Sequence, residues 1–430
     1  MSTRLGMSIQ QREVTMGEKA FLVTALILAS EAFLSILLGF DYLPGAGMGS
    51  LMMNTIWAIV FIVTYILLRR RGVSIPGELR KSPYLGLILA MPFLSVLWSA
   101  NPTITLLASF ALTGSALIAL YISLFFTSRE LLRLLVWTMG IMGVLSVVWA
   151  ICIPSLGIGT GEFEGQWLGI FSQKNVLGRM MSIGFLAALL LFKFTRGRRF
   201  QYLAFAGFML ALVCLAQSAT SLVFCLGLPL IWWFTKYVLT PAPKMIWRRV
   251  ILGAFGACIV WVLVIDFDQV VLALGRDEGL TGRTTLWALV IGAVGLHPLL
   301  GYGYEGFWRG SGAGGIPDEI WEKFGQFLWF SHSGLLELLL AFGLIGAAVL
   351  LGVCLVLVGR SIARLRRAFV LETAWPYLFL IYLIIMNATD DYILNMHTLQ
   401  TILFFTIILG VRHDSAIKLP RMSMPTGIGG

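Results

Sequence analysis

Two cations and an amide stand close together in the segment 169–179: Lys174, Asn175 and Arg179. They precede or open an apolar run, so we expect them on the first turns of a helix. Backbone N–H groups and the helix dipole favour negative charge at such a position. The three residues therefore form a candidate phosphate-binding site. The alternative is that Lys174 and Arg179 only extend their charged groups toward the water at the helix end.

A second group of polar residues surrounds the apolar stretch 286–296, with Arg283 before it and His297 after it. The stretch is too short to cross a membrane, so we expect an interfacial or re-entrant helix that holds the Arg283 guanidinium at headgroup depth. For Arg283 the alternative is a salt bridge with Asp277 or Glu278 in the same loop. For His297 it is a helix-end residue that caps backbone carbonyls.

A histidine and a glutamate open the next long apolar run. An imidazole with its reference pKa of about 6.5 can accept a proton near neutral pH, so His332 is a candidate general base. Glu337 lies more than one helical turn deeper, and an ionisable residue inside a membrane is a candidate functional group because its burial is costly. Glu337 is a candidate partner of His332, although five residues along a helix do not share one face. The alternatives are a structural ion pair for Glu337 and a solvated His332.

The composition decides what kind of molecule must position these groups. The 430 residues are 58% hydrophobic and only 12% charged, and the mean hydropathy is +0.89. Globular domains are roughly 45–50% apolar and about 25% charged. The chain is therefore an integral membrane protein, which excludes a soluble enzyme, a nucleic-acid-binding domain and a secreted disulfide scaffold. The five cysteines show no metal-binding spacing, so we expect no metal site, and we expect no cofactor.

The apolar runs predict an all-α polytopic membrane protein with about twelve transmembrane helices. The predicted spans are 20–40, 51–68, 84–98, 104–126, 132–153, 178–193, 200–217, 220–239, 250–265, 331–359, 374–388 and 395–411. They divide the chain into a cytoplasmic N-terminus (1–19), nine helices (20–265), a large outer loop (266–330), three more helices (331–411) and a disordered cytoplasmic tail (412–430).

The charges orient this arrangement. With a cytoplasmic N-terminus, 25 of the 31 lysines and arginines fall on one side, as the positive-inside rule requires, and both termini are cytoplasmic. The net charge of +10 thus reflects topology, and nucleic acid is not an expected partner. The outer side keeps six basic residues, namely Lys174, Arg179, Arg276, Arg283, Arg309 and Lys323. Glu31 is an acid within the first span and has no assigned role.

Five motifs in order resemble the O-antigen ligase and polysaccharide polymerase superfamily, most closely its ExoQ-like, Wzy-type exopolysaccharide-production branch. They are the turn Trp98–Pro102, the run Trp167–Gly178, Arg283 with Trp287, the run that begins at His297, and the His-Ser-x9-Gly-x-x-Gly pattern at His332–Gly346. They cover about residues 95–400. The chain departs from the family pattern at Gln173, where members often carry His, and at Ala219, where many carry a cation.

The resemblance implies a metal-independent, inverting glycosyltransferase at the periplasmic face of the bacterial inner membrane. It implies undecaprenyl-diphosphate-linked oligosaccharide as donor and a glycan as acceptor, in contact with membrane lipid and working beside a flippase and a chain-length regulator. We expect Arg283 to neutralise the diphosphate, with Lys174, Arg179 and Arg276 in support. His332 would accept the acceptor's proton. We expect supporting roles in the same site for Asn175, Glu337, His297 and Asp390.

Two other functions remain open. A ligase that transfers a finished glycan onto lipid A-core would use the same donor and motifs, and the missing cation at Ala219 favours a polymerase over it. A polytopic transporter or flippase of lipid-linked oligosaccharide also fits twelve spans. Transporters usually show matched halves and a midplane ion site, whereas here the halves differ and the polar groups gather on the outer side.

Overall fold

A computed structural model describes residues 13–33, 48–161, 164–239, 281–309, 313–325, 327–328, 330–387, 390 and 393–413. Within these ranges the regular elements are α-helices. Their bounds are α1 Met16–Ala29, α3 Met48–Arg70, α4 Ile75–Lys81, α5 Pro83–Ser95, α6 Pro102–Phe125, α7 Ser128–Cys152, α8 Pro154–Gly157, α9 Lys174–Phe194, α10 Arg199–Ala216, α11 Ala219–Leu239, α14 Thr281–Leu296, α15 Ile316–Phe324, α16 Gly334–Arg367, α17 Leu371–Asn387 and α18 Leu399–His413.

The all-α, polytopic architecture expected from the sequence is confirmed. In the described ranges, seven helices are long and apolar enough to cross a membrane: α3, α6, α7, α9, α10, α11 and α16. The shorter apolar helices α5, α17 and α18 lie in three further predicted spans, and α1 covers the first part of the span 20–40. The remaining predicted span, 250–265, lies outside the described residues, as do Arg276 and the predicted tail after His413.

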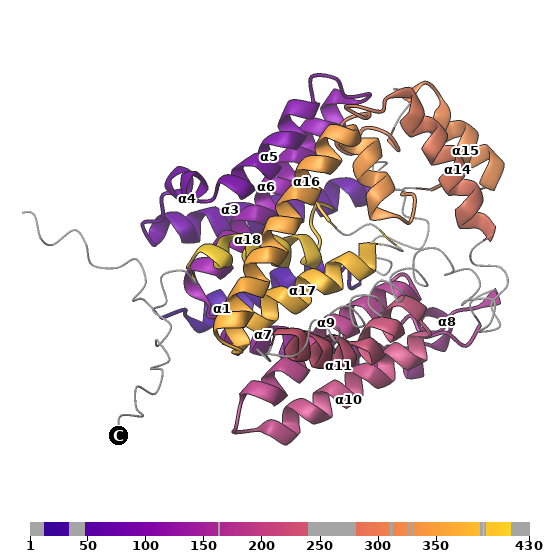
Figure 1. Ribbon diagram of the computed structural model, residues 1–430. Helices are drawn as coiled ribbons and strands as arrows, with labels where there is room; N and C mark the ends of the chain where they lie inside the picture. Colours follow the sequence, from indigo (N-terminus) through magenta and orange to yellow (C-terminus); the bar gives the residue numbers. More distant parts are fainter. Residues whose placement is uncertain are drawn as a thin grey trace, which may run out of the picture.

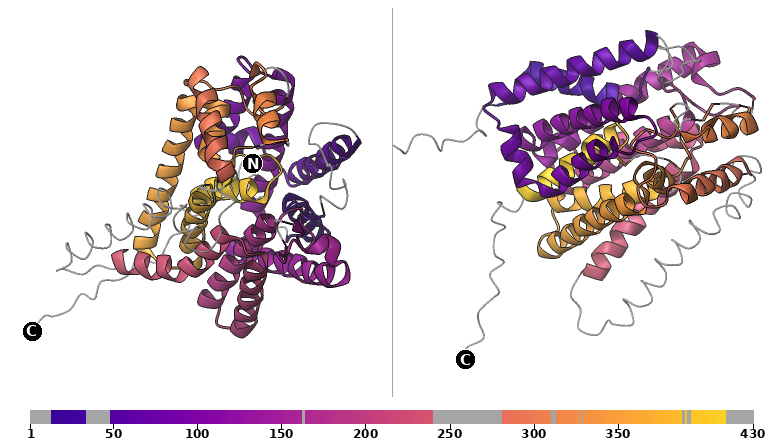
Figure 2. Two further views of the ribbon diagram at one scale, coloured as in Figure 1. Left: turned by 90° about the vertical axis from the view of Figure 1, so that its right-hand side faces the viewer. Right: turned by 90° about the horizontal axis from the view of Figure 1, so that it is seen from above.

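The helices form two groups joined by α17. One group contains α3, α5, α6, α16 and α18, and the other contains α7, α9, α10 and α11 (Figure 1). Helix α17 packs against members of both groups, and the left view of Figure 2 shows it between them. Helices α14 and α15 lie together beside one end of α16 (Figure 1). This end carries the segments that the sequence analysis assigned to the outer loop.

A break in α16 connects the outer loop to the bundle. Gly343 has a positive φ of 62° and ψ of −164°, and a Cβ there would lie 2.3 Å from the backbone of Leu299. The turn 298–302 fills the break. Leu344 N–H donates to the Pro298 carbonyl at 2.8 Å, Ile345 N–H to that of Leu299 at 3.2 Å, and Tyr302 N–H to that of Leu340 at 2.6 Å. The glycine thus permits close contact between the loop and α16.

A non-helical segment before α18 also lies within the bundle. The hydroxyl of Tyr304 donates to the Leu394 carbonyl, and His397 N–H donates to the hydroxyl of Ser115 in α6 at 3.3 Å. The His397 ring stacks on Trp57 of α3, with 4.7 Å between ring centroids. The sequence predicts this span from residue 395, whereas α18 begins at Leu399. Irregular backbone is tolerated at this position because protein groups satisfy it.

The opposite end of the bundle collects residues from the predicted cytoplasmic connections. Arg71 pairs with Glu18 at 2.6 Å, and its guanidinium lies 4.5 Å from the ring centroid of Phe125. Arg360 donates to the hydroxyl of Tyr84 at 3.0 Å. These contacts join the ends of α1, α3, α5, α6 and α16, so helix ends that share a predicted side also meet in the structure.

Candidate active site

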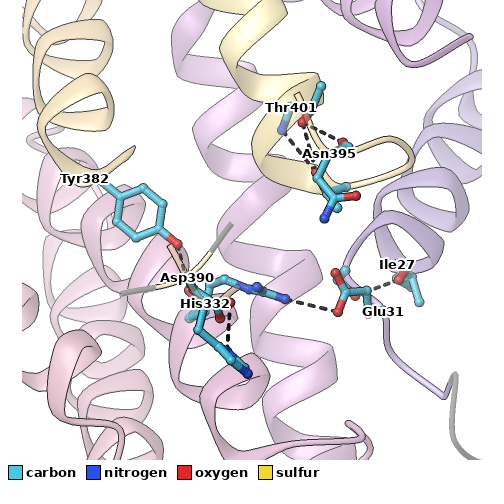
Figure 3. A network of polar contacts seen from close by, with 10 residues as sticks. Ile27, Glu31, His332, Tyr382, Asp390, Asn395 and Thr401 are labelled. Atoms are coloured by element: carbon cyan, nitrogen blue, oxygen red, sulfur yellow. Dashed lines mark hydrogen bonds and ion pairs between the residues drawn. The ribbon is translucent and has the colours of Figure 1, made fainter. Parts of the chain in front are cut away.

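His332 lies in the turn that leads into α16 and has a left-handed backbone, with φ of 56°. Its imidazole is 26% exposed, and Nδ1 lies 3.6 Å from Oδ1 of Asp390. The ring of Phe330 packs edge-on against the imidazole, with centroids 4.4 Å apart. In Figure 3 the His332 and Asp390 side chains lie between Tyr382 and Glu31. The histidine is therefore accessible on one side and faces a carboxylate on another.

Asp390 follows the end of α17 and ties that end to the start of α16. Its carbonyl accepts a hydrogen bond from Gly334 N–H at 3.0 Å, and its own N–H donates to the Met386 carbonyl at 3.2 Å. These two backbone bonds fix the position of the carboxylate relative to His332. A carboxylate so placed stabilises a protonated imidazole by charge attraction.

Glu337 contacts the backbone beside His332. Its carboxylate accepts hydrogen bonds from the backbone N–H of Ser331 and from the indole of Trp308, whose Nε1 lies 3.1 Å from both oxygens. The sequence suggested Glu337 as the partner of the His332 side chain. The structure gives that contact to Asp390 instead, because His332 lies in the turn before α16 while the Glu337 carboxylate is held by Ser331 and by Trp308 of the outer loop.

Arg283 lies on α14, and this helix contacts the residue that precedes His332. Trp287, one turn later on α14, donates from its indole to the Ser331 carbonyl at 2.8 Å. Residues four apart share one face of a helix, so half-buried Arg283 lies on the face of α14 that contacts the turn preceding His332. The structure thus brings Arg283 and His332 to neighbouring segments.

His297 lies at the other end of α14. Fourteen residues separate it from Arg283 in the sequence, which corresponds to about 21 Å at 1.5 Å per helical residue. Its exposed ring packs against Tyr302, with centroids 4.6 Å apart. The structure therefore does not bring His297 together with Arg283 and His332, and His297 directly follows the end of α14.

The two cations of the segment 169–179 differ in burial: Lys174 is half-buried, whereas Arg179 is buried. Helix α9 begins at Lys174, and Lys174 and Asn175 are half-buried on its first turn. Arg179 is only 5% exposed and pairs with Glu31 at 3.1 Å. The hydroxyl of Tyr382 in α17 donates to the Arg179 carbonyl at 3.4 Å. Glu31, which the sequence left without a role, is thus the counter-ion of Arg179.

Comparison with known proteins adds one relative. No family model matches the chain. The exopolysaccharide production protein ExoQ of Rhizobium meliloti is 28% identical over 296 residues. The chain is a distant homologue of ExoQ. The aligned part covers 64% of this chain and 63% of ExoQ, so the chain matches less than two thirds of its relative's length. The resemblance to ExoQ-like proteins inferred from the motifs is confirmed.

Several residues around the site were not predicted from the sequence. Trp308, Ser331 and Tyr382 belong to none of the sequence motifs. Trp308 and Ser331 nevertheless donate to the Glu337 carboxylate, and Tyr382 donates to the Arg179 carbonyl. Trp308 is 29 positions before Glu337, and no periodicity connects them. The available signal was the high tryptophan content of the outer loop, because an indole N–H in an apolar setting needs an acceptor.

Proposed function

We propose that this protein polymerises undecaprenyl-diphosphate-linked oligosaccharide repeats into exopolysaccharide at the periplasmic face of the inner membrane. The homology to ExoQ supports a role in exopolysaccharide production. The observation that carries the enzymatic part of the proposal is the His332–Asp390 pair, which presents a partly exposed imidazole beside the helix that bears Arg283.

In the proposed reaction, an acceptor sugar hydroxyl attacks the anomeric carbon of the donor from the side opposite the diphosphate. The carbon–oxygen bond to the diphosphate breaks, and its electrons remain on the leaving diphosphate. His332 accepts the hydroxyl proton as the new glycosidic bond forms, and the Asp390 carboxylate stabilises the resulting imidazolium. A 3.6 Å separation between Nδ1 and Oδ1 suits this role because the attraction strengthens when the imidazole is charged.

The leaving diphosphate gains charge, and cations fixed beforehand are the most effective means of stabilising it. We assign this task to Arg283, whose planar guanidinium can make two parallel bonds to phosphate oxygens, with Lys174 and Asn175 on the first turn of α9 in support. Arg276 remains a further proposed ligand from the same loop.

Arg179 receives a different role in this proposal. Its guanidinium is almost fully buried and already neutralised by Glu31. Such a pair is costly to break because one buried charge is left without a partner. We therefore assign the Arg179–Glu31 pair to holding the end of α1 against α9, next to Lys174, and we do not assign it to direct diphosphate contact.

Gene deletion followed by glycan analysis tests the proposal. A polymerase predicts that the deletion strain accumulates single repeats on undecaprenyl diphosphate and contains no long polymer. Long lipid-linked polymer that never reaches its acceptor would instead identify a ligase. Failure of single repeats to reach the periplasmic face would identify a flippase. Complementation with wild-type protein and with His332→Ala at equal membrane abundance separates loss of the reaction from loss of the protein.

A further inference from the structure

We propose that Glu337, Trp308 and Trp287 act as positioning residues that clamp the backbone of Ser331 and thereby hold His332 in its left-handed conformation facing Asp390. The inference rests on the proposed function only in treating His332 as the reacting base. The clamp itself is a statement about the conformation of one turn and is testable apart from the reaction.

Both backbone groups of Ser331, its N–H and its carbonyl, are hydrogen-bonded to side chains. Its N–H donates to the Glu337 carboxylate, and its carbonyl accepts from the Trp287 indole at 2.8 Å. Its hydroxyl donates to the Ser333 carbonyl at 3.2 Å, and the residue is completely buried. The peptide groups on both sides of Ser331 are thus fixed, so the chain enters His332 in one orientation.

The backbone of His332 requires this support. A positive φ of 56° is uncommon for a residue with a Cβ atom, because the side chain then crowds the backbone. The next residue, Ser333, is extended, and its side chain makes no cap bond to α16. The conformation therefore depends on hydrogen bonds made before the helix begins. Residues held in this way are typical of functional sites.

Glu337 suits the clamp because a carboxylate has acceptors only. Two neutral N–H groups donate to it, from Ser331 and Trp308, and within the described part of the chain no salt bridge engages it. Glutamine at this position would have one acceptor oxygen in place of two and an NH₂ group that only donates. Glu337→Gln therefore keeps the size of the side chain, but one neutral oxygen must accept both N–H groups without the charge that strengthens these bonds.

The two indoles tie the outer loop to the same point. Trp287 belongs to α14, one turn after Arg283, and Trp308 belongs to the segment that returns to the bundle after the turn 298–302. The Trp287 bond ties α14 to the Ser331 carbonyl without involving Glu337, whereas Glu337 and Trp308 hold the Ser331 N–H side of the turn. A change at Glu337 is thus expected to affect the rate of the reaction more than the binding of lipid-linked donor.

The test uses the purified full-length protein in lipid nanodiscs and reads His332 directly. Diethyl pyrocarbonate modifies accessible imidazoles, and mass spectrometry resolves His332 from exposed His297 in the same molecule. In Glu337→Gln we expect His332 to be modified at least about threefold faster, with His297 unchanged. We expect the polymerisation rate to fall roughly tenfold to hundredfold, as for a misplacement of about 1 Å, with KM for the donor within about twofold.

Two matched variants complete the design. Trp321→Phe removes an indole bond of the same 2.8 Å length, to the Leu328 carbonyl in the same outer region, and is expected to leave both readouts unchanged. In a His332→Ala background, Glu337→Gln is expected to cause no further loss of rate, because residues that act through one group are non-additive. An additional loss there would mean that Glu337 acts on something other than His332.

An unchanged His332 modification rate in Glu337→Gln overturns the clamp, whatever happens to activity. If that variant does not accumulate in the membrane, Trp287→Phe provides the same test, because it removes only the bond to the Ser331 carbonyl. If His332 modification accelerates as expected but His332→Ala polymerises normally, the clamp stands and the proposed role of His332 is lost. The two ideas therefore fail in different measurements.

Discussion

The two ends of the helical bundle use charge differently. At the predicted cytoplasmic end, Arg71 pairs with Glu18 and Arg360 binds Tyr84, so each contact joins neighbouring helix ends. At the outer end, Arg179 and Glu31 also pair, but the His332 imidazole faces Asp390 and is still 26% exposed. The cytoplasmic contacts fasten helices to each other. The His332–Asp390 pair leaves a titratable group accessible beside a carboxylate, which is what a reaction site requires.

If this contrast is correct, the largest loss of activity comes from His332. His332→Ala is expected to lower the polymerisation rate by about 10²–10⁴, the usual contribution of a positioned acid or base, while donor binding survives. His332→Gln, which can hydrogen-bond but is a very poor base, is expected to behave like Ala. The measurement is the lipid-linked single repeat that accumulates in membranes, with binding of donor by the purified protein. If His332→Gln makes long polymer at wild-type levels, His332 is not a base and only orients the acceptor.

Arg283 follows, with an expected loss of roughly 10²–10³ on removal of a group that stabilises developing charge. Arg283→Lys is expected to fail nearly as badly as Arg283→Ala, because an ammonium group cannot make two parallel bonds to a phosphate. Polymer length on gels, at matched membrane abundance, is the measurement. Arg309→Ala is the control, since Arg309 shares the outer loop but pairs with Glu305 at 3.4 Å. Normal polymer from Arg283→Ala would shift the assignment to Arg276 or Lys174.

Asp390 should give a smaller effect of the same kind. Asp390→Asn keeps the shape of the side chain and removes the charge that stabilises protonated His332. An opposite charge about 4 Å away contributes roughly 1–4 kcal/mol between bulk water and a protein surface, so we expect the rate to fall by roughly tenfold to hundredfold with KM for the donor little changed. Single-turnover rates with purified protein measure this step. If His332→Ala and the double variant with Asp390→Asn lose the same rate, Asp390 acts through His332. If the losses add, Asp390 acts independently of His332.

The smallest effect on activity is expected at the cytoplasmic end. Burial raises the pKa of Glu18, but hydrogen bonds from Arg71 and Thr15 and the charge of Arg71 outweigh it, so the pKa falls below the ordinary 4.5. The bound form is the carboxylate, so its contribution is present above that ordinary value and is lost as the pH falls through the lowered one.

Glu18→Gln should accordingly reduce the free energy of unfolding by about 1–2 kcal/mol at neutral pH and leave polymerisation intact. Thermal unfolding in detergent, at neutral and at acid pH, provides the measurement, and the difference from wild type should disappear on acidification. A loss of polymer in folded Glu18→Gln would remove the distinction between the two ends.

Long apolar segments were predictable because the membrane imposes one length and one helical period. The predicted span 104–126 corresponds to α6 at Pro102–Phe125, where Asn101 caps the helix by accepting from Ile104 N–H at 3.3 Å. The span from 395 began too early, because nothing in its composition shows that Tyr304 and Ser115 hold the preceding residues in a non-helical form.

The candidate site was predictable in its residue types and not in its pairings. His332, Arg283 and Lys174 followed from charge on the outer side, where topology does not require it. The partnership of His332 with Asp390 depends on how α17 meets α16, and that of Glu31 with Arg179 on how α1 meets α9. Contacts between helices far apart in sequence depend on packing of the whole bundle, which the hydropathy of each segment does not contain.

The break at Gly343 also constrains how the protein is made. The turn 298–302 leaves the ribosome before α16, yet its Pro298 and Leu299 carbonyls take their donors from α16. Until α16 enters the bilayer, these carbonyls are without those donors, and the amides of Leu344 and Ile345 have no acceptors in the loop. Neither segment can complete these backbone bonds alone, so the outer loop and α16 reach their final form together during membrane assembly.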